Sequence, residues 1–326
     1  MSNDASLPPR ADPPPAAAPS SRPSGRRIGT RALALLGGLL LLGGTLSVAA
    51  RAATAEPPPP GAVTSVEERW ATLRAHYFGD AEIHAGEDLL ALDAPGRAHD
   101  AAVVPVAVRA LDPARAIRRV HLIVDKNPLP LAGIFTFADA ARGWQTLETR
   151  IRINEYTTVR AVAELEDGSL AMVSRFVKAS GGCSAPAMGD LDAALARAGR
   201  MKVLLGEARM AAHGETEGAS PLESGSAASR GGALVAATIK ISHPNNSGMQ
   251  FDQVSRNYIP AFFVRRIGAE LGGVPLLDVE TNFSLSENPV IALHFPAEVG
   301  EGALAVHALD SKDNRYEAST PFASGS

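Results

Sequence analysis

Apolar residues recur at every second position over much of the chain between residues 101 and 178. Such alternation is typical of strands with one buried face. The series cover 104–108, 120–124, 147–153, 159–165 and 170–178. In the third series Glu148, Arg150 and Arg152 occupy the alternate positions, which predicts a charged outer face. Asp167-Gly168 is a favoured pair for a tight hairpin and separates the last two series.

A second block of short apolar segments begins at Leu234. We expect strands over 235–242, 262–270, 274–279, 290–295, 303–309 and 315–319. The pattern of a βαβ unit is absent, and turns separate the segments. The two blocks therefore predict an all-β chain built from two sandwich domains.

Helical periodicity occurs in only two places. Val66, Trp70, Leu73 and Tyr77 have the spacing of one short amphipathic helix. The segment 190–210 is also expected to be helical, with Asp190 as its N-cap. It is followed by a Gly/Ser/Glu-rich stretch. We therefore assign residues 186–233 to a flexible, partly helical linker between the domains.

The N-terminal region resembles a targeting sequence. Arg26, Arg27 and Arg31 precede an apolar run over 32–50, which leads into the small residues Ala53-Thr54-Ala55. This order predicts a secretory signal peptide over 1–55. The arginine pair suggests the twin-arginine route, and retention of the run as a membrane anchor is the alternative. We expect a periplasmic protein without stable membrane insertion after cleavage.

These boundaries give the expected domain organisation. Residues 56–100 would hold a Pro-rich spacer, the short helix and the start of the first domain. Residues 101–185 would complete the first sandwich, and residues 234–326 would form the second.

The charge balance narrows the range of partners. The chain has a formal net charge of −4. The predicted signal peptide contains far more arginine than acidic residues, so the mature protein is more acidic still. Nucleic acids and anionic membranes bind positive surfaces, so we expect neither as a partner.

The chain has a single cysteine, Cys183. Exported proteins use cysteines in pairs for disulfides, and one thiol cannot pair within its own chain. Gly181 and Gly182 precede it and Ser184 follows, so we expect an exposed thiol on a flexible arm. The alternative is a buried cysteine acting as a small hydrophobic residue. No basic residue lies within four positions to lower the thiol pKa, so the sequence predicts no strongly activated nucleophile.

Motifs for metal binding or catalysis are absent from the sequence. The histidines are scattered without metal-ligand spacing, and no nucleophile-elbow, phosphate-loop or zinc-protease motif occurs. We therefore expect no metal, no cofactor, no catalytic residues and no enzyme activity. A thiol enzyme whose partner groups come together through folding is the less favoured reading.

The chain resembles the SoxYZ carrier of bacterial thiosulfate oxidation, as a single-chain fusion. The SoxY-like part includes Val104-Pro105-Val106, Lys126-Asn127-Pro128 and the Gly181-Gly182-Cys183 arm. The SoxZ-like part includes Ser242-His243-Pro244 and Ser286-Glu287-Asn288-Pro289. The chain is most similar to the subfamily of quinoprotein dehydrogenase-associated SoxYZ-like carriers.

The resemblance implies two immunoglobulin-like sandwiches and a covalent carrier of sulfur intermediates at Cys183. Its partners would be periplasmic redox or sulfur-transfer enzymes, including a PQQ-dependent dehydrogenase and its cytochrome. Two features depart from the family. Ser184-Ala185-Pro186 replaces the glycines that follow the cysteine, and the arm continues into a second domain. The alternative function is an accessory or docking protein of a quinoprotein dehydrogenase, in which the thiol carries nothing.

Overall fold

A computed structural model of the chain describes residues 65–112, 114–186, 190–208, 234–253, 255–296 and 302–322. The predicted signal peptide and the segment 209–233 lie outside the described residues. Among the described residues no helix is long and apolar enough to cross a membrane.

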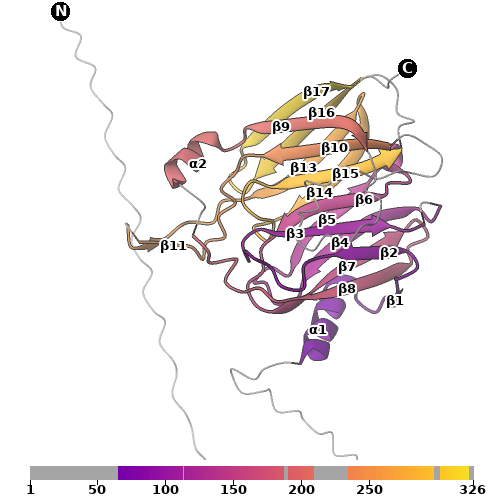
Figure 1. Cartoon of the computed structure of the whole chain (residues 1–326), viewed down its shortest axis with the longest axis horizontal. Coiled ribbons are helices and arrows are strands. Elements are labelled where there is room, and N and C mark those ends of the chain that lie inside the picture. The colour runs from indigo at the N-terminus through magenta and orange to yellow at the C-terminus, as the bar shows by residue number, and fades with distance from the viewer. Residues whose placement is uncertain are drawn as a thin grey trace, which may run out of the picture. The chain divides into compact units, whose positions relative to one another are not determined.

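The larger sheet has nine strands in the order β1-β8-β7-β4-β5-β14-β13-β16-β17 (Figure 1). Their bounds are β1 Ile83–Ala85, β4 Ile117–Val124, β5 Leu131–Phe137, β7 Thr157–Leu165, β8 Leu170–Val177, β13 Val264–Leu271, β14 Val274–Thr281, β16 Gly302–Asp310 and β17 Arg315–Phe322. All neighbours pair antiparallel except β1 and β8, which are parallel.

The smaller sheet has six antiparallel strands in the order β2-β3-β6-β15-β10-β9. Their bounds are β2 Leu90–Asp93, β3 Val104–Ala110, β6 Thr146–Ile151, β9 Met201–Ala208, β10 Leu234–Ile241 and β15 Val290–Pro296. A separate hairpin, β11 Phe251–Asp252 with β12 Asn257–Tyr258, projects from the body (Figure 1). The remaining elements are helices α1 Val66–Phe78 and α2 Leu191–Arg197 and the short 3-10 turn η1 Asp139–Ala141. The predicted all-β class is confirmed.

Both sheets continue from the N-terminal half of the fold into the C-terminal half. In the larger sheet β5 pairs with β14, with Phe137 opposite Leu277. In the smaller sheet β6 pairs with β15, with Thr149 opposite Ile291. Two pairs of antiparallel strands therefore join the halves directly by main-chain hydrogen bonds.

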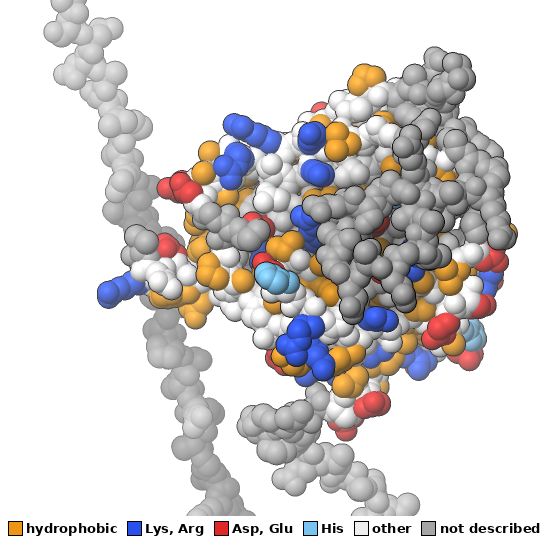
Figure 2. Space-filling view, viewed as in Figure 1, with side chains coloured by type: hydrophobic (Ala, Val, Ile, Leu, Met, Phe, Trp, Pro, Cys, Tyr) orange, Lys and Arg blue, Asp and Glu red, His pale blue; other side chains and the backbone are white. Residues whose placement is uncertain are grey.

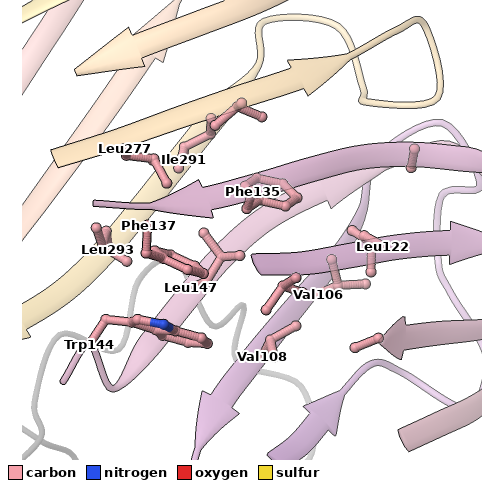
Figure 3. Close-up of a cluster of buried hydrophobic side chains, with 14 of the residues drawn as sticks. Val106, Val108, Leu122, Phe135, Phe137, Trp144, Leu147, Leu277, Ile291 and Leu293 are labelled. Carbon is pink, nitrogen blue, oxygen red and sulfur yellow. The ribbon is translucent and has the colours of Figure 1, made fainter. Parts of the chain in front are cut away.

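One hydrophobic core lies between the sheets and includes residues of both halves. Figure 3 shows Leu277 and Leu293 from the C-terminal half beside Phe137 and Leu147 from the N-terminal half. Trp144 stacks on Phe137 with ring centroids 4.4 Å apart. Period-two alternation directs one face of each strand into this layer, so the apolar series of the sequence account for the core.

Helix α1 covers part of the outer face of the larger sheet. Ser65 and Glu68 form a capping box at its N-terminus, and Trp70 packs against Ile123 and Val162. The Arg160 guanidinium lies 4.2 Å from the Trp70 ring centroid and also forms a buried ion pair with Asp125. This cover explains why β7 is buried on both faces rather than alternating.

The helix predicted over 190–210 is only partly correct. Helix α2 ends at Arg197, and Gly199 follows with φ +85°. Residues 201–208 form β9, which pairs with β10 along its whole length. In β9 Val203 is buried between the exposed Lys202 and Leu204, a period of two that the sequence reading took for a helical stripe. The linker assignment for this part was therefore wrong, since it is an edge strand of the smaller sheet.

Candidate functional site

Cys183 lies on a short segment, residues 181–184, which we call the cysteine strap. The strap follows β8 and is held against the chain just beyond β6. The Gly181 amide donates to the Asn154 carbonyl, and the Gly182 amide donates to the Ile153 carbonyl, both at 2.9 Å. The Ser184 amide closes a turn onto the Gly181 carbonyl.

The two glycines of the strap serve packing and turn geometry. A Cβ atom on Gly182 would lie 2.0 Å from the Ala101 carbonyl oxygen and 2.7 Å from that of Ile153. Gly181 has φ +82°, a conformation that L side chains rarely adopt. The sequence reading of Gly181, Gly182 and Ser184 as a freely flexible arm was therefore wrong for the conformation described, because all three take part in fixed main-chain contacts.

The thiol of Cys183 is buried, with 0% of the residue exposed. The expectation of an exposed thiol was wrong for this conformation. Burial raises the pKa of Cys183 to about 11, and the opposing charge of Arg152 lowers it only in part. The thiolate, which is the nucleophilic form, is thus disfavoured while the strap is in place.

Arg152 is the basic group beside the thiol. It follows β6 and is 1% exposed, although its position in the alternating series predicted a solvent-facing side chain. Its Nη1 donates to the Gly182 carbonyl at 3.1 Å, and its Nη2 donates to the Asn245 carbonyl at 3.4 Å. Burial lowers the pKa of Arg152, and the charge of Glu287 acts in the opposite direction. One guanidinium therefore joins the strap to the C-terminal half.

A loop of the C-terminal half, residues 243–250, covers the strap; we call it the cover loop. Ser247 Oγ donates to the Cys183 carbonyl at 2.5 Å. The Asn245 side chain fixes the loop, because Nδ2 donates to the Leu285 carbonyl and Oδ1 accepts from the Val264 amide. Asn245 itself has φ +48°, which asparagine tolerates better than most residues.

His243 anchors the start of the cover loop. Its Nδ1 accepts a hydrogen bond from the Asn245 amide, and its Nε2 lies 3.7 Å from Asp310. Burial lowers the pKa of His243 to about 4, so the ring is neutral at pH 7. A neutral ring that accepts at Nδ1 from the main chain of its own loop indicates a structural role for His243. Among the described residues no group of three or more His, Cys, Asp or Glu side chains could hold a metal ion.

Several buried polar atoms around the strap find no hydrogen-bond partner among the described residues. They are Arg152 Nε, Asn246 Oδ1, Gln250 Nε2 and Ser286 Oγ. Each of these residues is at most 2% exposed. The sequence alone did not identify any of the four as a site residue. The only local signal was a run of small polar residues after a predicted strand, which does not reveal burial.

Two family models match the chain. The model described as "Sulfur oxidation protein SoxY" matches residues 74–183, and the model described as "Sulphur oxidation protein SoxZ" matches residues 224–321. The first match ends at Cys183 itself. The second includes the cover loop. No curated protein matches the chain.

Solved structures give weaker likenesses. The sulfur carrier protein SoxY from Chlorobium limicola f thiosulfatophilum is 20% identical, with 35% of this chain and 94% of that chain covered and a TM-score of 0.30. The superoxide reductase (neelaredoxin) from Ignicoccus hospitalis is 16% identical over 32% of this chain and 87% of that chain, with a TM-score of 0.24. A beta-glycosidase from Bacteroides vulgatus is 10% identical, with 72% of this chain and 24% of the glycosidase chain covered and a TM-score of 0.20.

Proposed function

Because the chain belongs to the SoxYZ family of sulfur-oxidation proteins, with a SoxY and a SoxZ domain in one polypeptide, we propose that Cys183 is its covalent attachment point. The cargo is a sulfur-containing or related group, which the protein presents to partner enzymes. One observation carries the proposal. The SoxY match ends at the single cysteine of the chain, and that cysteine lies beside the buried guanidinium of Arg152.

The chemistry of attachment defines the kind of partner. When a thiol joins the outer sulfur of thiosulfate, a sulfur–sulfur bond forms, the thiol proton leaves and two electrons are released. A redox partner must accept those two electrons. The described residues of this chain supply a nucleophile and a cation, and the oxidation itself belongs to the partner. We therefore propose a carrier rather than an enzyme.

Loading requires the cysteine strap to move, because a buried thiol cannot reach another protein's active site. The hydrogen bonds that close the strap are few: its amides donate to the Asn154 and Ile153 carbonyls, and its carbonyls accept from Arg152 and Ser247. Such bonds contribute about 0.5–1.5 kcal/mol each. Their sum is small enough for an open form to exist as a minor population that a partner can select.

The location and the partners are further parts of the proposal. The predicted signal peptide supports export to the periplasm, by the twin-arginine route or another. The resemblance to quinoprotein dehydrogenase-associated carriers suggests a PQQ-dependent dehydrogenase and its cytochrome as redox partners.

The proposal is tested on protein purified from its native compartment. Intact-mass spectrometry should find a mass added to the chain, and peptide mapping should place it on Cys183. A strain with Cys183→Ser should lose the adduct and the dependent oxidation, while a Ser174→Ala strain, changed at an exposed position on β8, should keep both. An unmodified thiol during active turnover would refute the carrier function.

One observation favours the alternative of an accessory or docking protein. The thiol is fully buried and its pKa is raised to about 11, as expected for an inert cysteine that packs as a small hydrophobic residue. In that case the Cys183→Ser strain would retain full dehydrogenase-linked growth. The same pair of strains thus decides between the two functions.

A further inference from the structure

Burial of the Arg152 guanidinium costs free energy unless an anion or another acceptor compensates its charge. A buried guanidinium loses its hydration, and carbonyl contacts recover only part of that loss. Arg152 bonds to two carbonyl oxygens, and its Nε remains without a partner among the described residues. Glu287 and Asp100 act on its charge and favour the ionised form. The side chain is therefore a cation with an unused donor, buried beside a thiol.

Further unused donors come from the C-terminal half. The main chains of 150–152 and 284–286 pair, since the Arg152 amide donates to the Ser284 carbonyl and the Ser286 amide donates to that of Arg150. This pairing puts the Arg152 and Ser286 side chains on the same face, and the Ser286 hydroxyl is unpartnered among the described residues.

Gln250 brings a third donor to the strap. Its Oε1 accepts from the Ser247 amide, and the Ser247 hydroxyl in turn donates to the Cys183 carbonyl. The Gln250 Nε2 group is fully buried and finds no partner among the described residues. Asn246 Oδ1 is the one acceptor among these unpartnered atoms. The site thus holds the Arg152 cation, on which the charges of Glu287 and Asp100 also act, and an excess of unpartnered donors among the described residues. Such donors suit a small anion with several acceptor oxygens.

We propose that Arg152, Gln250 and Ser286 form an anion-binding site beside Cys183, which holds a negatively charged oxygen-rich group once it is attached to the sulfur. The inference rests on the proposed function, because it describes the charge of the cargo. It adds that the closed conformation is selective, because it stabilises an anionic adduct and gives no such support to a neutral one.

The test compares two adducts that differ in charge. Tetrathionate converts the thiolate to Cys–S–S–SO₃⁻ and releases thiosulfate, because the central sulfur–sulfur bond of the reagent breaks. Methyl methanethiosulfonate converts it to Cys–S–S–CH₃ and releases methanesulfinate. Both reactions are run on purified protein in mild denaturant, so that the thiol is accessible, and loading is checked by intact mass after removal of reagent and denaturant.

Thermal unfolding of the two adducts is then measured. In the wild-type protein the sulfonate adduct should melt a few degrees above the methyl adduct. In Arg152→Gln this difference should vanish or reverse, and in Arg152→Lys part of it should remain. The comparison is made within each variant, so a general loss of stability from the substitution cancels. Gln250→Ala and Ser286→Ala should each reduce the difference without abolishing it.

The control variant is Arg118→Gln. Arg118 is an exposed arginine near the start of β4. The other end of β4 leads to Asn127, which contacts Asn154, and Asn154 in turn contacts Gly181 of the strap. The variant therefore removes a positive charge at the end of β4 away from Cys183. It should keep the wild-type difference. Equal melting of the two wild-type adducts, or an unchanged difference in Arg152→Gln, would overturn the anion site. Failure here would leave the carrier function standing if native protein carries an adduct on Cys183, whereas native protein without that adduct would refute the carrier function whatever the melting comparison shows.

Discussion

The Ser247 hydroxyl donates a hydrogen bond to the main-chain carbonyl of Cys183 across 64 positions of sequence. This bond links the cover loop of the SoxZ domain to the cysteine strap of the SoxY domain. The SoxZ half therefore contributes directly to the surroundings of the buried thiol.

Loss of that bond should make the thiol more reactive. In Ser247→Ala the closed strap loses one hydrogen bond, worth about 0.5–1.5 kcal/mol, so the open form should become about twofold to tenfold more populated. The rate at which iodoacetamide labels Cys183 at pH 8 should rise by the same factor. Ser174→Ala on β8 serves as the control and should label at the wild-type rate. An unchanged rate in Ser247→Ala would mean that this bond does not govern opening.

A methyl group at Gly182 should displace the strap. The added Cβ would approach the main chain of Ala101 to 2.0 Å, and backbone cannot yield as a flexible side chain can. We expect Gly182→Ala to melt several degrees lower and to label faster at Cys183. Gly206 on β9 has no atom within 4 Å of the position of an added Cβ, so Gly206→Ala should change neither property. Equal behaviour of the two variants would contradict the close packing of the strap.

The raised pKa of Cys183 predicts a loss of stability in alkali. The pKa of about 11 in the folded state exceeds the ordinary value of 9.0, so the unfolded chain loses this proton first. Stability should therefore fall as the pH rises from about 9 to 11, by about 1–2 kcal/mol from this group. Urea titrations of wild type and Cys183→Ser across this range isolate the effect from other titrating groups. Parallel pH profiles would show that the thiol is not sheltered.

Glu148 on β6 predicts a second pH dependence near neutrality. Burial and the charge of Asp93 raise its pKa from 4.5 to about 7. Asp93 and Glu148 both pair with Ala107 of β3, from opposite sides, so the three positions lie in one row across the smaller sheet.

The folded state binds the Glu148 proton more tightly than the unfolded state does, so the free energy of unfolding should fall as the pH rises from about 4.5 to 7. The expected size is about 1 kcal/mol after allowance for screening at this partly exposed group. Glu148→Gln should remove this part of the profile and stabilise the protein at pH 8, as measured by urea unfolding. Glu155→Gln, at an exposed carboxylate outside the strands, should retain the wild-type slope. A wild-type profile that is flat between pH 4.5 and 7 would contradict the raised pKa.

Trp70 should hold helix α1 on the sheet. Its ring receives the Arg160 guanidinium and covers apolar side chains of the larger sheet. Trp70→Ala should cost about 2–3 kcal/mol of stability through lost burial and the lost cation–π contact. Urea unfolding of this variant, with the exposed Glu67→Gln as control, measures the loss. A loss as small as that of the control would show that the helix contributes little to the fold.

The strands could be predicted from sequence wherever one face alone is buried. Residues of the series 147–153 alternate in the sequence, and successive positions of β6 alternate between half-buried and buried. Strand β9 was mistaken for a helix because Met201 and Leu205 continue the helical spacing of Leu191, Leu195 and Ala198. The edge position of the strand, with Leu204 exposed, depends on its pairing with β10, which no local pattern encodes.

The candidate site could be predicted only in its central residue. Cys183 is conspicuous because it is the single cysteine. Arg152 looked like one of several surface arginines, and its burial depends on segments that are distant in sequence, including Gly182 and Asn245. Gly182 was read as flexible, because a glycine required by a close contact and one that provides flexibility look identical in sequence.

The pairing of β5 with β14 and of β6 with β15 has a consequence for assembly. Where two separate subunits form such an interface, dilution drives them apart and unequal synthesis leaves one of them orphaned. In a single polypeptide the partners are always present in equal number, and their association no longer depends on concentration. The closed arrangement over Cys183 can thus persist in a compartment where the protein is scarce.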